Sequence, residues 1–142
     1  MAENLKTMRL AFILLLPVFC SAQIEIKKTS RFTVGEIKAT HTSLSGVVEN
    51  EDTTYMLAYE NMEYKTITDI QVVSFKGAAT LNTLYETLKA VFVSKEDLDF
   101  KLGNTSVMVK VGKMIGVPYI TFFGKSGFTY ITEKQLDKLF GK

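Results

Sequence analysis

The sequence contains a single histidine, His41, on which most nucleophilic chemistry would depend. A Ser–His–Asp triad would need it as the general base. Its neighbours Thr40, Thr42 and Ser43 are too close along the chain to indicate a pairing in space. Zinc sites normally take several His or Cys ligands, and one histidine with one cysteine does not supply them. We therefore interpret His41 as a loop or strand-end residue and predict no catalytic, cofactor-binding or metal-binding residue.

The tripeptide Gly124-Lys125-Ser126 is similar to the end of a phosphate-binding loop. The full motif needs a glycine five positions before Gly124, where this chain has Tyr119. A helix should also follow the motif at once, whereas residues 128–131 have the pattern of a strand. The segment is therefore predicted to be a hairpin turn.

Carboxylates concentrate in two runs, residues 49–52 and residues 96–99. Neither run has the spacing of an EF-hand, and charged residues are typical of exposed turns. Two carboxylates at a suitable separation can hydrolyse a glycosidic bond, but a sequence does not reveal that separation. A small hydrolase using Glu60, Glu63 or Asp69 stays open as an alternative.

Tyrosines are the other feature with chemical potential. Tyr55, Tyr59 and Tyr64 lie on or beside one predicted strand, and Tyr119 and Tyr130 lie on later strands. Aromatic residues on a sheet can anchor a partner or stack on a ligand. Aromatic pairs across strands also stabilise sheets in any case, so core packing is the competing interpretation. We predict the first three as the ligand or partner surface, if the chain has one.

The first 22 residues have the layout of a secretory signal peptide. Lys6 and Arg9 precede an apolar run at residues 10–19, and small residues lead to a predicted cleavage after Ala22. The run is shorter than the roughly 20 residues that a spanning helix needs. Lipid attachment at Cys20 is disfavoured because the bulky Phe19 precedes it. The expected location is secreted or periplasmic, with no integral membrane segment after cleavage.

The chain from residue 23 onward has a net charge of +1 and no cysteine. This balance gives no electrostatic reason to expect nucleic acid or an acidic membrane as partner. Without disulfides, stability outside the cytosol must come from the core. We expect a polar lead-in at 23–30 and one domain at 31–142. Asn104 lies in an N-glycosylation pattern, which matters only in a eukaryotic secretory pathway.

Alternating apolar residues predict strands on both sides of a central helix. In the first half they lie at about 31–40, 44–48, 53–59 and 65–75. Gly46 marks a predicted bulge, and Tyr55, Leu57 and Tyr59 are predicted to share one face. In the second half the strands lie at about 98–102, 107–111, 117–123 and 128–131. The nearly continuous apolar run 117–123 is predicted to be a central strand covered on both faces.

Two helices are expected. The central one, at about 78–93 with Thr80 as N-cap, is predicted by an apolar stripe with spacings of three and four: Leu81, Leu84, Tyr85, Leu88, Val91 and Phe92. Thr132 and Gln135 form a capping-box pattern that starts a short helix at about 133–140. The predicted fold is α+β, a mainly antiparallel sheet of about seven to eight strands with the long helix packed on a face. Residues 73–77 and 120–124 resemble one another weakly, which hints at duplication.

These observations favour an exported, non-catalytic binding or interaction module with no cofactor. Its partner would be an unknown protein, peptide or small ligand rather than nucleic acid. The carboxylate hydrolase is one alternative, and a concave site with two convergent acids would support it. A self-associating structural subunit is the other alternative, which predicts an unpaired edge strand.

Overall fold

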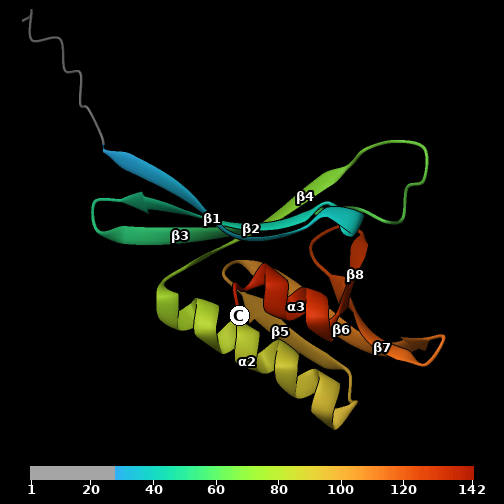
Figure 1. Ribbon diagram of the computed structural model, residues 1–142. Coiled ribbons are helices and arrows are strands. Elements are labelled where there is room, and N and C mark those ends of the chain that lie inside the picture. Colours follow the sequence, from blue (N-terminus) through green and yellow to red (C-terminus); the bar gives the residue numbers. More distant parts are fainter. Residues whose placement is uncertain (1–27) are drawn as a thin grey trace, which may run out of the picture.

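The computed structural model describes residues 28–142, in which four antiparallel strands and a helix occur twice in succession (Figure 1). The predicted signal peptide and cleavage after Ala22 lie outside the described residues. The elements of the first half are β1 Thr29–Ile37, the 3₁₀ turn η2 Lys38–Thr40, β2 Thr42–Glu49, β3 Asp52–Glu60, β4 Ile70–Lys76 and α2 Ala78–Ser94. Those of the second half are β5 Leu98–Leu102, β6 Thr105–Met114, β7 Val117–Phe123, β8 Phe128–Thr132 and α3 Glu133–Leu139.

The strands form two separate sheets, with orders β1-β2-β3-β4 and β5-β6-β7-β8, called the first and the second sheet below. The predicted α+β class, the antiparallel pairing and both helices are confirmed. Hydrophobic alternation predicts strands but not which strands pair, so it did not separate the two sheets. Residues 73–77 lie at the end of β4, the fourth strand of the first half, and residues 120–124 lie at the end of β7, the third strand of the second half. The two similar stretches therefore do not occupy matching places.

Tight turns hold each sheet in register. Glu49 pairs with Asp52 around Asn50 and Glu51, whose φ angles are 49° and 71°. Met114 pairs with Val117 around a second such turn. Positive φ at both central residues is the signature of a type I′ turn, whose twist matches the twist of the strands that it joins. Consecutive strands therefore pair as hairpins throughout each half.

One hydrophobic core lies between the inner faces of the two sheets. Tyr55, Leu57 and Tyr59 all point into it, so their predicted common face is confirmed. The second sheet and the helices contribute further buried residues to the same cluster: Val107, Val109, Ile120, Phe122, Ile131, Leu84, Leu88, Val91, Phe92, Leu136 and Leu139. The rings of Tyr59 and Phe122, with centroids 5.9 Å apart, join the two inner faces directly.

Each helix packs on the sheet of the other half. The α3 helix lies against β1 and β2, and α2 lies against β6 and β7; Figure 1 shows both helices beneath the first sheet. Each helix also contacts the strand that precedes it in its own half. Neither sheet would keep its inner face covered without the other half, so the two halves share one core. Within residues 28–142 no helix is long and apolar enough to cross a membrane.

Three local expectations are corrected by the structure. The β1 strand starts at Thr29, within the predicted lead-in, and β4 starts only at Ile70 because residues 61–69 form a loop. The N-cap of α2 is Gly77 rather than Thr80, one turn earlier than expected. Gly77 has φ of 90°, a conformation that glycine adopts without strain.

The predicted bulge at Gly46 lies instead in β1, between Thr33 and Gly35. A Cβ atom on Gly35 would meet the backbone carbonyl oxygens of Lys138 and Leu139, at the end of α3. Gly46 is fully paired, and the ring of Phe32 covers it. Glycine at position 35 therefore permits the close approach of α3 to the first sheet.

We expect Gly35→Ala to lower the free energy of unfolding by about 2 kcal/mol or more, because backbone must move to admit the methyl group. Gly46→Ala is the matched control, since there only the half-exposed Phe32 ring must turn aside. Urea titration measures both variants. Equal losses would show that the approach of α3 does not require glycine at position 35.

Candidate functional site

The outer face of the second sheet carries a row of aromatic rings. Side chains alternate between the two faces of a strand, so the buried Val109, Ile120 and Phe122 place their neighbours on the outer side. The strand register puts four rings there, from β7 and β8: Tyr119, Phe123, Phe128 and Tyr130. We call these four residues the aromatic face. The expectation that β7 is covered on both sides is wrong, because its outer side chains are partly exposed.

The four rings form one continuous chain of contacts. Tyr119 meets Tyr130 edge-on with centroids 5.3 Å apart, and Tyr130 meets Phe128 at the same centroid distance. Phe128 and Phe123 follow at 5.6 Å, and the Lys110 ammonium lies 5.7 Å from the centroid of Phe123. Edge-to-face and tilted contacts of this kind are favourable for aromatic rings. The rings are thus held in place and keep part of their surface open to solvent.

A groove of about 870 Å³ opens at the Phe123 end of this face. Phe123, Phe128 and Met108 form part of its apolar wall. Three charged side chains also line it: Glu63, Asp99 and Lys125. We call it the Asp99 groove. It can accept an apolar group against the rings and a charged or hydrogen-bonding group beside them.

A second hollow of about 640 Å³ lies near the middle of the aromatic face. Phe128 and Tyr130 line it from the second sheet, and Tyr64 and Lys65 line it from the loop between β3 and β4. Phe128 also lines the Asp99 groove, so one ring is shared by both depressions. The loop 61–69 therefore completes a surface whose floor belongs to the other half of the chain.

Buried Asn61 fastens that loop to the second sheet. Its Oδ1 accepts hydrogen bonds from the backbone N–H of Glu63 at 3.0 Å and of Phe128 at 3.3 Å. Its Nδ2 donates to Asp69 at 3.1 Å, and the Met62 N–H donates to the Phe128 carbonyl at 2.9 Å. A buried amide with these partners is satisfied and rigid. The sequence indicated Asn61 only as a turn residue.

Tyr59 holds the turn between β7 and β8 from beneath. Its hydroxyl donates to the Ser126 carbonyl at 3.0 Å, and burial raises the pKa of this phenol above its ordinary value. A Cβ atom on Gly124 would meet the Tyr59 hydroxyl, and one on Gly127 would meet the Asn61 side chain. The segment that contains Gly124-Lys125-Ser126 is thus a hairpin turn, as predicted, and a strand follows it.

The three tyrosines predicted as a surface do not form one. Tyr55 is 7% exposed and Tyr59 is fully buried, because both point to the inner side of β3. Tyr64 is 47% exposed and lines the second hollow beside Tyr130. The competing interpretation, core packing, applies to the first two. The alternation of β8 could have indicated Phe128 and Tyr130, but it does not tell which side of the strand is covered.

Of the candidate acids of a hydrolase, Glu60 and Glu63 both line the second hollow, whereas Asp69 does not. Asp69 accepts hydrogen bonds from Asn61 and Gln71, which tie it to the loop. Glu60 lies 3.8 Å from His41 Nε2, and Glu63 lines the Asp99 groove. His41 lines neither depression. Among residues 28–142, no three His, Cys, Asp or Glu side chains gather closely enough to hold a metal ion.

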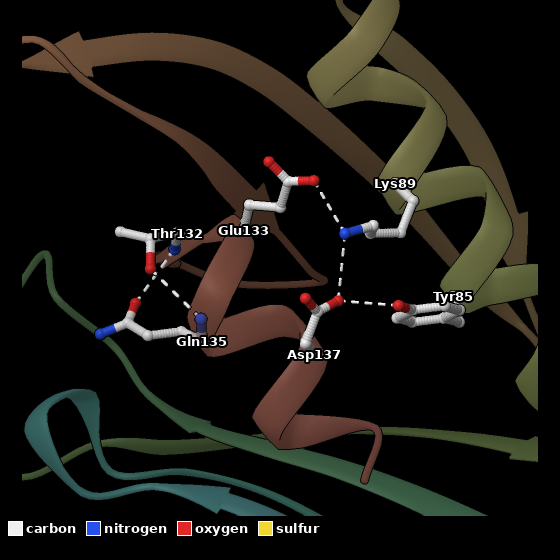
Figure 2. A network of polar contacts seen from close by, with 6 residues as sticks. All are labelled: Tyr85, Lys89, Thr132, Glu133, Gln135 and Asp137. Carbon is white, nitrogen blue, oxygen red and sulfur yellow. Dashed lines mark hydrogen bonds and ion pairs between the residues drawn. The ribbon is translucent and has the colours of Figure 1, made fainter. Parts of the chain in front are cut away.

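A second polar cluster joins the two helices (Figure 2). The Tyr85 hydroxyl donates to Asp137 at 2.7 Å, and the Lys89 ammonium bonds Glu133 at 2.8 Å and Asp137 at 3.1 Å. The bond from Tyr85 is the main cause that lowers the pKa of Asp137, and Lys89 adds to it. The bond to Glu133 raises the pKa of Lys89, and the bond to Asp137 raises that of Tyr85. Lys89 binds both carboxylates of this cluster, and Tyr85 also binds that of Asp137, so the cluster is a clamp between α2 and α3.

The same end of α3 carries the predicted capping box. The Gln135 N–H donates to the Thr132 hydroxyl at 3.3 Å, and the Thr132 N–H donates to the Gln135 amide oxygen at 3.0 Å (Figure 2). This reciprocal pair satisfies two N–H groups that the first turn of a helix leaves open. The prediction from Thr132 and Gln135 is therefore confirmed.

Comparison with known proteins adds no relative: no family model matches the chain, and neither curated proteins nor solved structures return a significant match.

Asn61→Ala should lower the free energy of unfolding by about 2 to 3 kcal/mol, because buried N–H groups of Glu63 and Phe128 lose their acceptor. Asn82→Ala, at an exposed position of α2, is the control and should change stability little. Urea titration gives both values. A loss at Asn61 no greater than at Asn82 would contradict its role as the fastener of the loop.

The Asp137 clamp predicts a dependence of stability on acid. The pKa of this carboxyl is lower in the folded chain than the usual value of about 3.9, so its contribution is present above that pH and disappears as the pH falls through the folded pKa. The melting temperature of wild type should exceed that of Asp137→Asn at neutral pH, and the difference should shrink below about pH 4. Calorimetry at several pH values measures it, with Asp99→Asn as the control. A constant difference from pH 7 to pH 2 would contradict the clamp.

Proposed function

We propose that this chain is an exported binding module whose partner-binding surface is the aromatic face with its two depressions. The partner is a protein or peptide segment that places apolar side chains against the rings. The leader pattern in the first 22 residues supports export. No catalytic step and no cofactor are part of the proposal.

One observation carries the proposal: four contiguous aromatic rings lie on a sheet face that neither helix covers. Both helices contribute to the shared core, and the outer rings are half-buried, so each keeps part of its surface open to solvent. Aromatic side chains are enriched at the centres of protein interfaces, because they bury much area and lose little conformational entropy. Rings that served only the stability of the domain would gain more from the core than from this position.

The charges beside the rings indicate what the partner carries. Asp99 and Glu63 line the groove and make no side-chain hydrogen bond within the described residues. Each can accept a hydrogen bond from a lysine, an arginine or a free amino terminus of the partner. Lys125 at the same groove can meet a carboxylate or a backbone carbonyl. A peptide with alternating apolar and charged residues fits this arrangement.

The hydrolase alternative has two favourable observations, since Glu63 and Asp99 line the same groove and Glu60 and Glu63 line the second hollow. Glycosidases use two carboxylates in this way. Self-association is the other alternative, and β1 is an edge strand of the first sheet. The bulge between Thr33 and Gly35 interrupts the regular pairing that an added strand would need.

The test is selection of a displayed random peptide library on the chain from Gln23, which includes the complete core between Ile37 and Phe140. We expect selected peptides to bind wild type and to lose roughly tenfold or more in affinity for Phe128→Ala, because this ring lines both depressions. Asp99→Lys is a second variant, at an exposed position, that should reject peptides with a basic residue.

Val72→Ala is the matched control, because Val72 is an exposed apolar residue on the first sheet and lies outside both depressions. Circular dichroism confirms that each variant is folded. Equal affinity of all variants would reject the aromatic face as the binding surface. Turnover of glycoside substrates that disappears in Glu63→Gln or Asp99→Asn would favour the hydrolase instead.

A further inference from the structure

The hairpin between β6 and β7 ends in an uncovered apolar tip. Ile115 is 99% exposed, and Met114 and Val117 on either side of the turn are 59% and 52% exposed. Figure 1 shows this hairpin extending beyond the two helices. Single exposed apolar residues are ordinary, but three within four positions at the end of a projecting hairpin form a contiguous patch. We call residues 113–117 the hairpin tip.

The turn at the tip holds Ile115 in a backbone conformation that a β-branched residue adopts only with strain. Ile115 and Gly116 have φ angles of 51° and 77° and form a two-residue turn between the paired Met114 and Val117. Such turns favour Asn-Gly, because asparagine tolerates this region far better than a β-branched side chain does. The chain therefore keeps isoleucine at a position where a polar residue would fold at lower cost, which points to a use for the exposed side chain.

Charge is segregated along the same part of the chain. No acidic residue occurs between Asp99 and Glu133, although four lysines do: Lys101, Lys110, Lys113 and Lys125. Lys113 is exposed and is the charged residue of the tip. Tyr119 lies two residue pairs behind the Met114–Val117 pair, on the same outer face as Met114. In space, acids border this stretch: Asp97 accepts a hydrogen bond from the Val111 N–H, and Val117 lines a hollow with Glu133 and Asp137. The positive charge at the tip itself is that of Lys113.

We infer that the hairpin tip docks on an anionic lipid surface. Ile115, Met114 and Val117 enter the boundary between headgroups and acyl chains, Lys113 meets the anionic headgroups, and Tyr119 lies at headgroup level. An apolar end followed by a cation and an amphipathic ring is the order that a membrane interface favours. A partner protein would match the same residues only with an apolar pocket that carries an acid at its rim.

Tyr119 belongs to both surfaces, but docking by the tip leaves the two depressions of the aromatic face accessible, because Tyr119 lines neither of them. The Asp99 groove includes Met108, six residues along β6 from Met114. At about 3.3 Å per residue the two ends lie roughly 20 Å apart, so a shallow insertion does not reach the groove. The two sites can therefore be tested separately, and the inference stands on the tip alone.

The test is co-sedimentation of the chain from Gln23 with vesicles of phosphatidylcholine that contain about one third phosphatidylglycerol. This chain lacks the apolar run at residues 10–19, which could itself partition into lipid. We expect wild type to bind and Ile115→Asn to bind about tenfold more weakly, since it removes the most exposed apolar side chain. Ile115→Asn should also raise the melting temperature, because it installs the favoured turn residue. Loss of binding together with a gain in stability is not expected of a merely structural residue.

Two further variants complete the design. Lys113→Gln should weaken binding about fivefold on the anionic vesicles and should change little on phosphatidylcholine alone. Val93→Asn, 82% exposed on α2, is the matched control and should bind as wild type does. Absence of wild-type binding, or equal binding of wild type and Ile115→Asn, would overturn the inference. So would a tip variant that leaves vesicles unaffected and weakens only the peptides selected on the groove.

The same assay separates the two proposals. Phe128→Ala should keep vesicle binding and lose the selected peptides, whereas Ile115→Asn should do the reverse. Failure of the aromatic face therefore leaves the tip standing, and failure of the tip leaves the aromatic face standing.

Discussion

The structure depends on one constraint: two sheets have four faces, and this chain has only enough helix to cover two of them. Burial of apolar area supplies most of the driving force, and the helices α2 and α3 join the same core as the two inner faces, each packing against the sheet of the other half. The outer faces must then carry polar side chains or bind a partner. The first sheet has serines and threonines among its outer residues, for example Ser45 and Thr54, whereas the second carries four rings.

Each half contributes a different part of the proposed binding surface, and the contacts that join the halves explain why. Asn61 and Tyr59 belong to the first half and hold the turn of the second through hydrogen bonds with Phe128 and Ser126. Asn61 is buried and its amide is fully bonded, so both ends of the loop 61–69 are held in place, although residues 62–68 are exposed and have no regular structure. It can therefore serve as one wall of a binding surface whose floor is the opposite sheet.

The two proposals use different ends of the second sheet. One end combines rings with the acids of the Asp99 groove, and the other combines apolar residues with Lys113. A near-neutral net charge conceals this polarity, because the acids and the lysines are averaged over the chain. An electrostatic argument about partners needs the positions of charges and not only their sum.

Local signals in the sequence were sufficient for the elements themselves. The stripe from Leu81 to Phe92 predicted α2, the Thr132–Gln135 pair predicted the start of α3, and alternation predicted the inward face of β3. These features depend on neighbours within a turn or two of the same segment, so the amino-acid order alone determines them. The separation into two sheets, the burial of Tyr55 and Tyr59, and the partial exposure of Phe128 and Tyr130 depend on which faces the core covers. That choice is made by packing between residues far apart in the chain, and period-two alternation is the same for a face that is covered and one that is open.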